Sequence, residues 1–513
     1  MHGKTARNRV AGGLGLLTAL IVACGGDPGG PRSGRVQVRL VLDLQALSPT
    51  TSIIPVAGLT IAISRIGDGA AAVVDTALAL SPQAGAMDVV VSVPVEAESA
   101  MFSIVASIVT DADETVFMSA ADTVTLSTND PDQPLPVDVT FRFVWEAVDA
   151  GDFVTCALAA GGRAFCWGFS TFGQLGDGVI GSDTSTAPAP VLGGVRYTTI
   201  SVGGFAACGI AENGQAHCWG TDLDGTLGDG LPAGPGHLRG EPGPVAGGQT
   251  WSSLTVGYHH ACGIGTDGVP YCWGNNHLGQ LGAESSDTCD IEACSATPIA
   301  LTAVANVRQV SAGIGSTCVL DDDGTAYCSD FNDPTAGFLP SPAPGGASFA
   351  SVTAGALYQC ALHADQRGYC WGTSNFTGQL GLGGTVANTM PSPVLSLGPL
   401  RMITASSANA VLAHTCAVTV DDQAYCWGWG EHGQLGAPAT RSCVFNTMVV
   451  SCVMEPLAVN TDLKFATVTV GYRHTCGMTT DRRLFCWGAN DRAQLGNGTL
   501  MGSTSPVEVR PPS

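Results

Sequence analysis

The chain has 513 residues, of which 45% are apolar and only 12% charged, with a formal net charge of −22 at pH 7. This length allows two or more domains, and the apolar content excludes a chain that is disordered throughout. Two lysines, Lys4 and Lys464, stand against 43 acidic residues, whereas phosphate binding needs clustered lysine and arginine, so nucleic acid is not expected as a partner.

The first 23 residues have the pattern of an export signal, with basic residues followed by an apolar stretch over residues 11–23. That stretch is too short to span a bilayer as a stable helix. Its end, Ile-Val-Ala-Cys-Gly at residues 21–25, resembles the bacterial lipobox, in which the cysteine becomes lipidated after cleavage. We therefore expect a lipoprotein signal peptide over residues 1–23 and lipidation at Cys24. An ordinary signal peptide with a chance cysteine is the alternative.

Residues 24–34 are rich in glycine and would form a flexible tether between the membrane surface and the first folded domain. Residues 35–141 contain neither cysteine nor tryptophan. Five segments there are rich in β-branched residues, and several alternate with a period of two: 36–42, 59–63, 89–93, 102–106 and 137–141. Strands at this spacing favour a β-sandwich of immunoglobulin-like or transthyretin-like kind.

Cysteines dominate the rest of the chain. Apart from Cys24 there are 18, an even number in a chain with an export signal, which indicates disulfides. Seven pairs have a constant separation of ten residues: Cys156 and Cys166, Cys208 and Cys218, Cys262 and Cys272, Cys318 and Cys328, Cys360 and Cys370, Cys416 and Cys426, Cys476 and Cys486. Two local pairs lie in longer loops, Cys289 with Cys294 and Cys443 with Cys452. Structural zinc prefers cysteines two to four residues apart, so this spacing disfavours a metal.

The seven pairs recur at intervals of 42 to 60 residues, which is typical of a propeller or solenoid array. A turn-forming pair, such as Asn213-Gly214 or Asp323-Gly324, lies midway between the two cysteines, so each pair brackets a hairpin. In six of the seven repeats a Trp-Gly follows: Trp167, Trp219, Trp273, Trp371, Trp427 and Trp487. The same six continue with Gly-Gln-Leu-Gly or a close variant, at residues 173–176, 225–228, 279–282, 378–381, 433–436 and 493–496. The fourth repeat has Ser329-Asp330 and lacks both motifs.

This order of a glycine and often His-Thr, a turn, Trp-Gly and Gly-Gln-Leu-Gly resembles the regulator-of-chromosome-condensation repeat, as at residues 257–262 and 471–476. The resemblance covers about 365 residues in seven repeats. It implies an all-β fold, with a seven-bladed β-propeller over residues 142–513 preceded by the small β-sandwich domain over residues 35–141. The six tryptophans are then expected to pack between neighbouring blades, with each N–H within reach of a loop carbonyl.

Two segments compete for closing the ring of blades. Pro136-Val137 precedes Cys156 by about the spacing that later Pro-Val segments keep from their cysteines. Residues 506–509, Pro-Val-Glu-Val, have no following hairpin and could complete the first blade. We expect the C-terminal segment to do so.

The sequence offers no site for catalysis. Every cysteine of the mature chain has an expected partner or lipid, and no known hydrolase, zinc or phosphate-loop motif is present, so we expect no catalytic residue, cofactor or metal. His260, His414 and His474 each lie two residues before a first cysteine. Equivalent positions of different blades are well separated, so a structural role is expected for them. The two stapled loops are either preordered binding elements or loops protected from proteolysis.

We therefore expect a non-enzymatic binding protein, exported to a bacterial cell envelope or cell surface and held there only by its lipid anchor. Its propeller loops would contact another protein or a cell-surface polymer. The resemblance permits this, because secreted bacterial members of the family inhibit β-lactamases by protein contact. Guanine-nucleotide exchange on a small GTPase, the activity of the nuclear family member, is the alternative. The export signal, the disulfides and the acidic charge speak against it.

Overall fold

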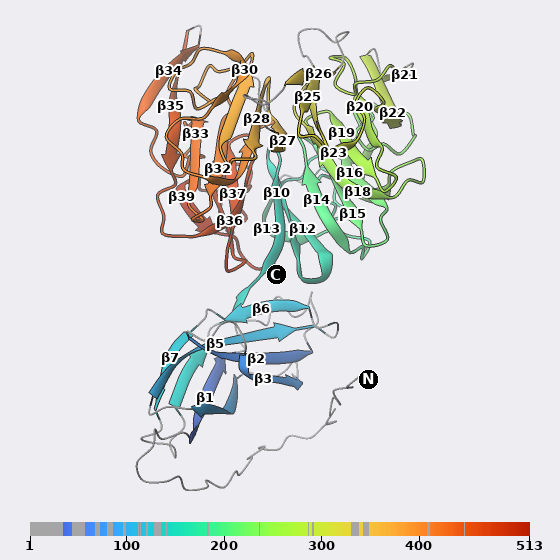
Figure 1. Cartoon of the computed structure of the whole chain (residues 1–513). Helices are drawn as coiled ribbons and strands as arrows, with labels where there is room; N and C mark the ends of the chain where they lie inside the picture. The colour runs from blue at the N-terminus through green and yellow to red at the C-terminus, as the bar shows by residue number, and fades with distance from the viewer. Residues whose placement is uncertain are drawn as a thin grey trace.

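The computed structural model has an all-β architecture, as the sequence predicts (Figure 1). It describes residues 34–43, 57–66, 72–79, 86–95, 99–110, 112, 114–119, 122–127, 135–139 and 141–512, the last range without residues 182–183, 235, 286, 290–291, 330–337, 342–347, 408–410 and 446. The strands form nine sheets, two before residue 144 and seven after it. Among the described residues, no helix has the length and apolar character needed to cross a membrane.

The two N-terminal sheets share one core. The smaller has the order β4-β1-β8 and the larger the order β3-β2-β5-β6-β9, with β7 also paired to β5. Their bounds are β1 (Gly34–Asp43), β2 (Gly58–Arg65), β3 (Ala72–Ala79), β4 (Ala86–Val95), β5 (Ser99–Val109), β6 (Thr115–Ser119), β7 (Asp122–Ser127), β8 (Leu135–Val139) and β9 (Phe141–Phe143). Alternate residues of β2, namely Leu59, Ile61 and Ile63, are fully buried against residues of β1 and β4, as the period of two along a strand requires.

The seven later sheets, numbered here 1 to 7 in chain order, each contain four consecutive antiparallel strands, and sheets 3 and 6 add a fifth. Sheet 1 is β10 (Trp145–Ala150), β11 (Val154–Ala159), β12 (Arg163–Phe169) and β13 (Thr184–Pro190); sheet 2 is β14 (Tyr197–Val202), β15 (Ala206–Ala211), β16 (Ala216–Thr221) and β17 (Leu238–Pro244). Sheet 3 is β18 (Trp251–Val256), β19 (His260–Gly265), β20 (Pro270–Asn275), β21 (Asp287–Cys289) and β22 (Glu292–Ala300); sheet 4 is β23 (Val307–Ala312), β24 (Thr317–Asp321), β25 (Ala326–Ser329) and β26 (Phe338–Ser341).

The remaining sheets repeat this plan. Sheet 5 is β27 (Phe349–Ala354), β28 (Tyr358–His363), β29 (Gly368–Gly372) and β30 (Asn388–Pro393). Sheet 6 is β31 (Leu400–Ala405), β32 (His414–Thr419), β33 (Ala424–Trp429), β34 (Arg441–Phe445) and β35 (Met448–Ala458), and sheet 7 is β36 (Phe465–Val470), β37 (His474–Thr479), β38 (Leu484–Gly488) and β39 (Ser503–Glu508).

The middle hairpin of each sheet follows the sequence pattern. Its two cysteines lie directly opposite each other in the strand register, as Cys156 and Cys166 do in sheet 1. The sixth residue after each first cysteine has a positive φ, between 64° and 82°. Glycine occupies this position in sheets 1 to 4, but Gln366, Asp422 and Arg482 adopt the same left-handed conformation in the other three. The turn conformation is therefore retained where the favoured glycine is not.

The expectation that the C-terminal segment closes the ring is wrong, and the competing candidate at Pro136 does not close it either. The C-terminal strand β39 pairs with β38 inside sheet 7, and β8, which contains Pro136, pairs with β1 of the N-terminal sheets. The inner strand of sheet 1 is instead β10, which begins at Trp145. Each sheet is thus complete within its own stretch of chain, and the Pro-Val segments end the outer strands of their own sheets. The ring closes by contacts between sheets 1 and 7 without a shared strand.

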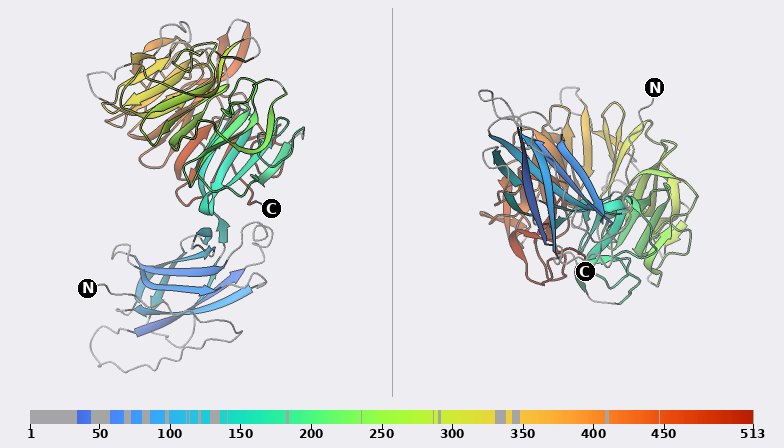
Figure 2. Two further views of the ribbon diagram at one scale, coloured as in Figure 1. Left: turned by 90° about the vertical axis from the view of Figure 1, so that its right-hand side faces the viewer. Right: turned by 90° about the horizontal axis from the view of Figure 1, so that it is seen from below.

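The N-terminal sheets lie against one face of the seven later sheets (Figures 1 and 2). Strand β9 pairs with β6, so residues 142 and 143 belong to the N-terminal unit, beyond the boundary expected after residue 141. Glu114 pairs with Arg163 at 3.1 Å and with Arg196 at 3.2 Å. Both arginines lie beside the middle-hairpin turn of sheet 1, so the N-terminal unit lies against the face on which these turns lie, at sheets 1 and 7. We call the opposite face the distal face.

Candidate functional site

The residues singled out by their periodicity form the scaffold. All nine expected cysteine pairs are joined in disulfides. Each of the seven hairpin pairs is buried. Cys24 and the segment expected to be its signal peptide and tether lie outside the described residues.

The tryptophans join neighbouring sheets through one recurrent hydrogen bond. Each indole N–H donates to the carbonyl of the second residue of the Gly-Gln-Leu-Gly motif in the preceding sheet, at 2.9–3.0 Å. The pairs are Trp219 with Gln174, Trp273 with Thr226, Trp427 with Gln379, Trp487 with Gln434, and Trp167 with Gln494. Trp371 is the exception, because sheet 4 has no such motif; it stacks on Phe349 at 5.7 Å instead. The two motifs thus recur together because they bind each other.

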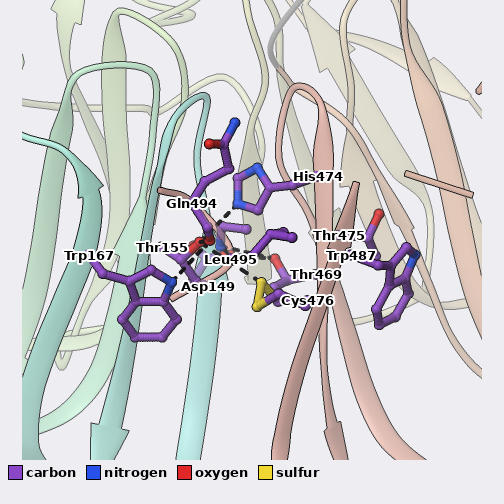
Figure 3. The surroundings of a disulfide bond; sticks show 12 residues. Asp149, Thr155, Trp167, Thr469, His474, Thr475, Cys476, Trp487, Gln494 and Leu495 are labelled. Atoms are coloured by element: carbon purple, nitrogen blue, oxygen red, sulfur yellow. Dashed lines mark hydrogen bonds between the residues drawn. A yellow bond between two sulfur atoms is a disulfide. The ribbon is translucent and has the colours of Figure 1, made fainter. Parts of the chain in front are cut away.

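The three histidines are part of the same junctions. His474 Nε2 lies 2.8 Å from the Thr155 hydroxyl, which in turn donates to the Gln494 carbonyl at 3.0 Å (Figure 3). The hydroxyl has one proton and the carbonyl can only accept, so Nε2 must carry the imidazole proton. His260 with Thr317 and His414 with Thr475 repeat this arrangement. Burial lowers the pKa of all three histidines to about 3, so they are neutral and structural, as expected.

A ring of small residues marks where the sheets approach one another most closely. It consists of Gly151, Gly203, Gly257, Gly313, Gly355, Ser406 and Gly471, each just beyond an inner strand. At four of the seven junctions the backbone N–H that follows one ring residue donates to the carbonyl of the next ring residue, as Tyr258 does to Gly313 at 3.1 Å, and Ser406 donates to the Gly471 carbonyl through its side chain. A Cβ added to Gly203 would collide with the Gly257 carbonyl oxygen. The segments that follow this ring are therefore held rigidly on the distal face.

Aromatic side chains from five sheets form a continuous arc on the distal face. Nine rings contact one another in sequence, with centroids 4.4–6.3 Å apart: His432, Trp429, Tyr472, Phe153, Phe169, Phe172, Phe205, Tyr258 and His259. Trp429 is buried, and the other eight are partly exposed. We call this set the aromatic arc. It crosses sheets 6, 7, 1, 2 and 3.

Each stapled loop borders one end of the aromatic arc. At one end, Trp429 packs in a small core with Val450 and the Cys443–Cys452 disulfide of the β34–β35 hairpin, and Tyr472 lies against this core. At the other end, His259 lies within hydrogen-bonding distance, 2.6 Å, of Asp224. Asn275 donates both to Asp224 and to Glu292 beside the Cys289–Cys294 disulfide. The two local disulfides therefore fix segments that border the arc.

One acidic side chain is buried beside the aromatic arc. Asp152 directly follows ring residue Gly151 and is only 4% exposed. No described residue donates a hydrogen bond to its carboxyl group, and burial raises its pKa well above the usual value. Its charge helps to raise the pKa of Tyr258 to about 12, after burial as the larger cause, and Tyr472 contributes further. Asp152, Tyr258 and Tyr472 thus belong to one electrostatic neighbourhood.

A second polar group has the composition of a metal site. Ligand atoms of Asp222, Asp229 and His237 lie within 4.8 Å of one another. The imidazole already bridges the two carboxylates at 2.9 and 3.4 Å, and Arg239 pairs with Asp229 at 2.8 Å. Asp222 also accepts a hydrogen bond from the backbone of Leu227. Side chains of the protein thus balance these charges, and we interpret the group as an ion-pair network that closes the long loop of sheet 2.

Sequence reasoning missed the aromatic arc and Asp152. A signal was present, because the fourth and third residues before the first cysteine read Asp-Phe, Gly-Phe, Tyr-His and Tyr-Arg in repeats 1, 2, 3 and 7. Sequence reasoning also missed a polar residue that lies seven positions before the first cysteine of most repeats. Its side chain forms hydrogen bonds between the inner strands of neighbouring sheets. Ser201 accepts a hydrogen bond from Val256 N at 3.0 Å, for example, and Asp149 from Val202 N at 2.8 Å.

Comparison with known proteins agrees with the repeat pattern. Family models described as "Regulator of chromosome condensation (RCC1) repeat" match residues 145–174, 267–320, 421–478 and 465–494. The chain is 26% identical over 372 residues to the ultraviolet-B receptor UVR8 of Arabidopsis thaliana, covering 70% of this chain and 80% of the receptor. A 148-residue segment, 29% of this chain, is 30% identical to the human E3 ubiquitin-protein ligase HERC2, but it spans only 3% of that protein.

The fold is similar to that of a solved member of the family. The crystal structure of Prp20p from Saccharomyces cerevisiae superposes with a TM-score of 0.56 at 19% identity, covering 72% of this chain and 87% of Prp20p. The seven later sheets thus have the propeller fold of Prp20p, and the repeat motifs occupy equivalent positions in the six sheets that carry them. The chain therefore contains regulator of chromosome condensation repeats and has the fold of proteins built from them.

Proposed function

We propose that this chain is a non-enzymatic binding protein whose distal face binds a partner protein or a polymer of the cell envelope. In this proposal each of sheets 1 to 7 is one blade of a seven-bladed propeller. The N-terminal sheets form a separate β-sandwich domain, with the signal peptide and the tether preceding it as the sequence suggests. The sandwich packs on the face opposite the aromatic arc and leaves the arc to the partner.

The observation that carries this proposal is the aromatic arc. Single exposed apolar side chains are common on protein surfaces and need no explanation, but contiguous clusters of them mark interaction sites. Tyrosine, tryptophan, phenylalanine and arginine are enriched in protein interfaces. Nine rings in continuous contact, eight of them partly exposed, therefore favour a recognition surface over a chance grouping.

The stapled loops support the same face. Both border the arc, and a disulfide-bridged loop loses less conformational entropy when it binds. This position favours their role as binding elements, although the same bridges also protect exposed loops from proteases.

Proteins of this fold are known to bind other proteins. The crystal structure of Prp20p was described together with its binding properties to Gsp1p and histones. Nucleotide exchange on a small GTPase remains the alternative for this chain. Nine disulfides, however, favour an oxidising compartment, in which a cytosolic or nuclear GTPase is not encountered.

Export and anchoring through Cys24 complete the proposal. Attachment through the N-terminal side would leave the distal face directed away from the membrane, because the N-terminal sheets lie against the opposite face. Incorporation of labelled palmitate by the intact chain, and its loss in Cys24→Ala, is the expected result. Labelling that persists in Cys24→Ala would refute the anchor.

The binding proposal is tested by capture from a cell-envelope extract with the purified chain and two variants. Phe172→Ala combined with Phe205→Ala removes two rings from the middle of the arc. Leu395→Ala removes an exposed apolar side chain outside the arc and is the matched control. We expect the double variant to lose the captured partner and the control to keep it. Equal capture by both would contradict a binding role for the arc.

A further inference from the structure

We infer that the aromatic arc recognises a lysine ammonium group of a partner protein, with Asp152 as its counter-ion and the rings of Phe153, Tyr258 and Tyr472 as its walls. This inference rests on the proposed function and adds the chemistry of the ligand. Ammonium groups are bound by aromatic faces through cation–π attraction, most strongly where water is excluded.

Asp152 is the first part of the argument. A buried carboxylate is costly unless a hydrogen bond or an opposite charge compensates it. The neighbouring buried acid Asp149 is compensated within the chain, because its carboxylate accepts hydrogen bonds from Val202 N, Ser201 and Thr469. Asp152 is 4% exposed and has no such donor among the described residues. It is thus an acceptor whose partner the described chain does not supply.

The rings next to Asp152 are the second part. Phe153 follows it directly in sequence and contacts the Tyr472 ring at 5.9 Å. Tyr258 reaches back from sheet 3, where its ring lies over Gly204, so that a Cβ on this glycine would be 3.0 Å from Tyr258 Cδ2. The Phe205 ring supports Tyr258 at 5.5 Å. Rings from sheets 7, 1, 2 and 3 therefore gather near one buried acid.

The chain itself shows that this surface takes cations. The Arg473 guanidinium lies 4.9 Å from the Tyr472 centroid and 5.9 Å from that of Trp429. The Arg492 guanidinium lies 5.3 Å from the Phe169 centroid. Among the described residues, no arginine or lysine lies over Phe153, Phe205 or Tyr258 in the same way. Phe153 and Tyr258 thus have no cation of the described chain over their rings, whereas Tyr472, the third wall, already has the Arg473 guanidinium over it.

Charge favours a cation over a neutral ligand. The chain has a formal net charge of −22, which attracts basic partners at long range. A neutral sugar would stack on the rings and donate hydroxyl hydrogen bonds to Asp152, but it would not offset the negative charge of the carboxylate. A lysine side chain matches both the rings and the carboxylate, because its methylene stem packs on the rings and its ammonium group pairs with the Asp152 charge.

The test is isothermal titration calorimetry of the full chain with two peptides. One peptide has a single lysine between neutral residues, and the other has Nε-acetyl-lysine at that position, which removes the charge. We expect the wild-type chain to bind the lysine peptide at least tenfold more tightly. Asp152→Asn, which keeps the shape and removes the charge, is expected to abolish this preference. Glu241→Gln changes an exposed carboxylate outside the arc and is expected to retain it.

Two further measurements keep the test decisive. Melting temperatures of the variants show whether they fold. If Asp152→Asn does not fold, Tyr258→Leu is tested in its place. We expect Tyr258→Leu to lose several-fold in affinity for the lysine peptide. Equal affinity of the wild type for both peptides, or an unchanged preference in the variants, would overturn the inference. If Phe172→Ala with Phe205→Ala loses the envelope partner while Asp152→Asn keeps it, the proposed function stands and only the cation site fails. If neither variant affects capture, both fail.

Discussion

His474 of sheet 7 donates from Nε2 to the hydroxyl of Thr155 in sheet 1 at 2.8 Å, across 319 residues of chain. Thr155 donates in turn to the Gln494 carbonyl, which also accepts from the Trp167 indole at 3.0 Å (Figure 3). The first and last sheets are thus joined by the hydrogen bonds that join other neighbouring sheets. Among the described strands, none is shared by sheets 1 and 7, so the stability of the closure depends on these contacts and on the apolar residues packed around them.

Removal of the Thr155 hydroxyl is expected to weaken the closure. Thr155→Val keeps the volume but leaves the buried His474 N–H without an acceptor, which costs about 1–3 kcal/mol in the free energy of unfolding. Thr198→Val removes a hydroxyl that bonds the Ile210 carbonyl at an exposed position, and is expected to cost about 0.5 kcal/mol or less. Urea denaturation at pH 7 measures both. Similar shifts in the two midpoints would show that the closure contact is not special.

The buried histidines predict a loss of stability in acid. A histidine whose folded pKa is lowered binds fewer protons in the folded state, so its contribution is complete above the unfolded pKa of about 6.5 and is lost as pH falls toward about 3. Between pH 7 and pH 5 each of the three should cost about 2 kcal/mol. Burial raises the pKa of Asp149 and of Asp152, so these carboxyl groups have the opposite effect on the pH dependence. The folded state binds more protons than the unfolded state, and the stability that these two groups contribute at low pH is lost as the pH rises.

Variants separate the histidine contribution from that of the acids. His474→Gln keeps a donor near the Nε2 position and cannot titrate, so its melting temperature should fall less than that of the wild type between pH 7 and pH 5. His277→Gln replaces an exposed histidine and should leave the dependence unchanged. If the melting temperature of His474→Gln fell with pH as steeply as that of the wild type, His474 would not be buried and neutral in the folded protein.

The tryptophans offer a matched pair for the inter-sheet hydrogen bond. Trp487→Phe loses the bond to the Gln434 carbonyl, whereas Trp371→Phe has no such bond to lose in the described part of the chain. Both variants lose similar apolar surface. Trp487→Phe should therefore be the less stable by about 1 kcal/mol, measured as free energies of unfolding. The reverse order would contradict the role given to the Gly-Gln-Leu-Gly carbonyl.

The ring of small residues should tolerate no side chain. Gly203→Ala places a methyl group against the Gly257 carbonyl and is expected to cost about 3 kcal/mol or more, or to prevent folding. Gly236→Ala, where a Cβ meets no atom within 4 Å and φ is not in the left-handed region, should be tolerated. Circular dichroism melting curves of both compare them directly. A folded Gly203→Ala of wild-type stability would mean that the sheets can move apart at the ring.

The sequence by itself determined the repeat unit. The two cysteines and the turn residues of each repeat act within one hairpin, and the Trp-Gly of six repeats lies at the junction between sheets. These residues therefore recur at fixed spacing, and their pattern predicts the local structure. The partners of the fourteen cysteines in the repeats followed from that periodicity, and the other four cysteines pair with local neighbours. The resemblance of the repeat motifs implied the family and its all-β fold. The scaffold can be predicted from the sequence because all seven repeats form the same disulfide-bonded hairpin.

Only the tertiary structure decided how the ring closes and where the aromatic arc lies. Periodicity could not show that β10 rather than β39 completes sheet 1, because either strand satisfies the same local pattern and the choice depends on how the N-terminal sheets use β8 and β9. The arc combines Phe153, Phe205, Tyr258 and Tyr472 from four sheets, at positions where other sheets carry other residues. Such a site departs from the repeat, and it becomes visible only when the ring brings distant segments together around Asp152.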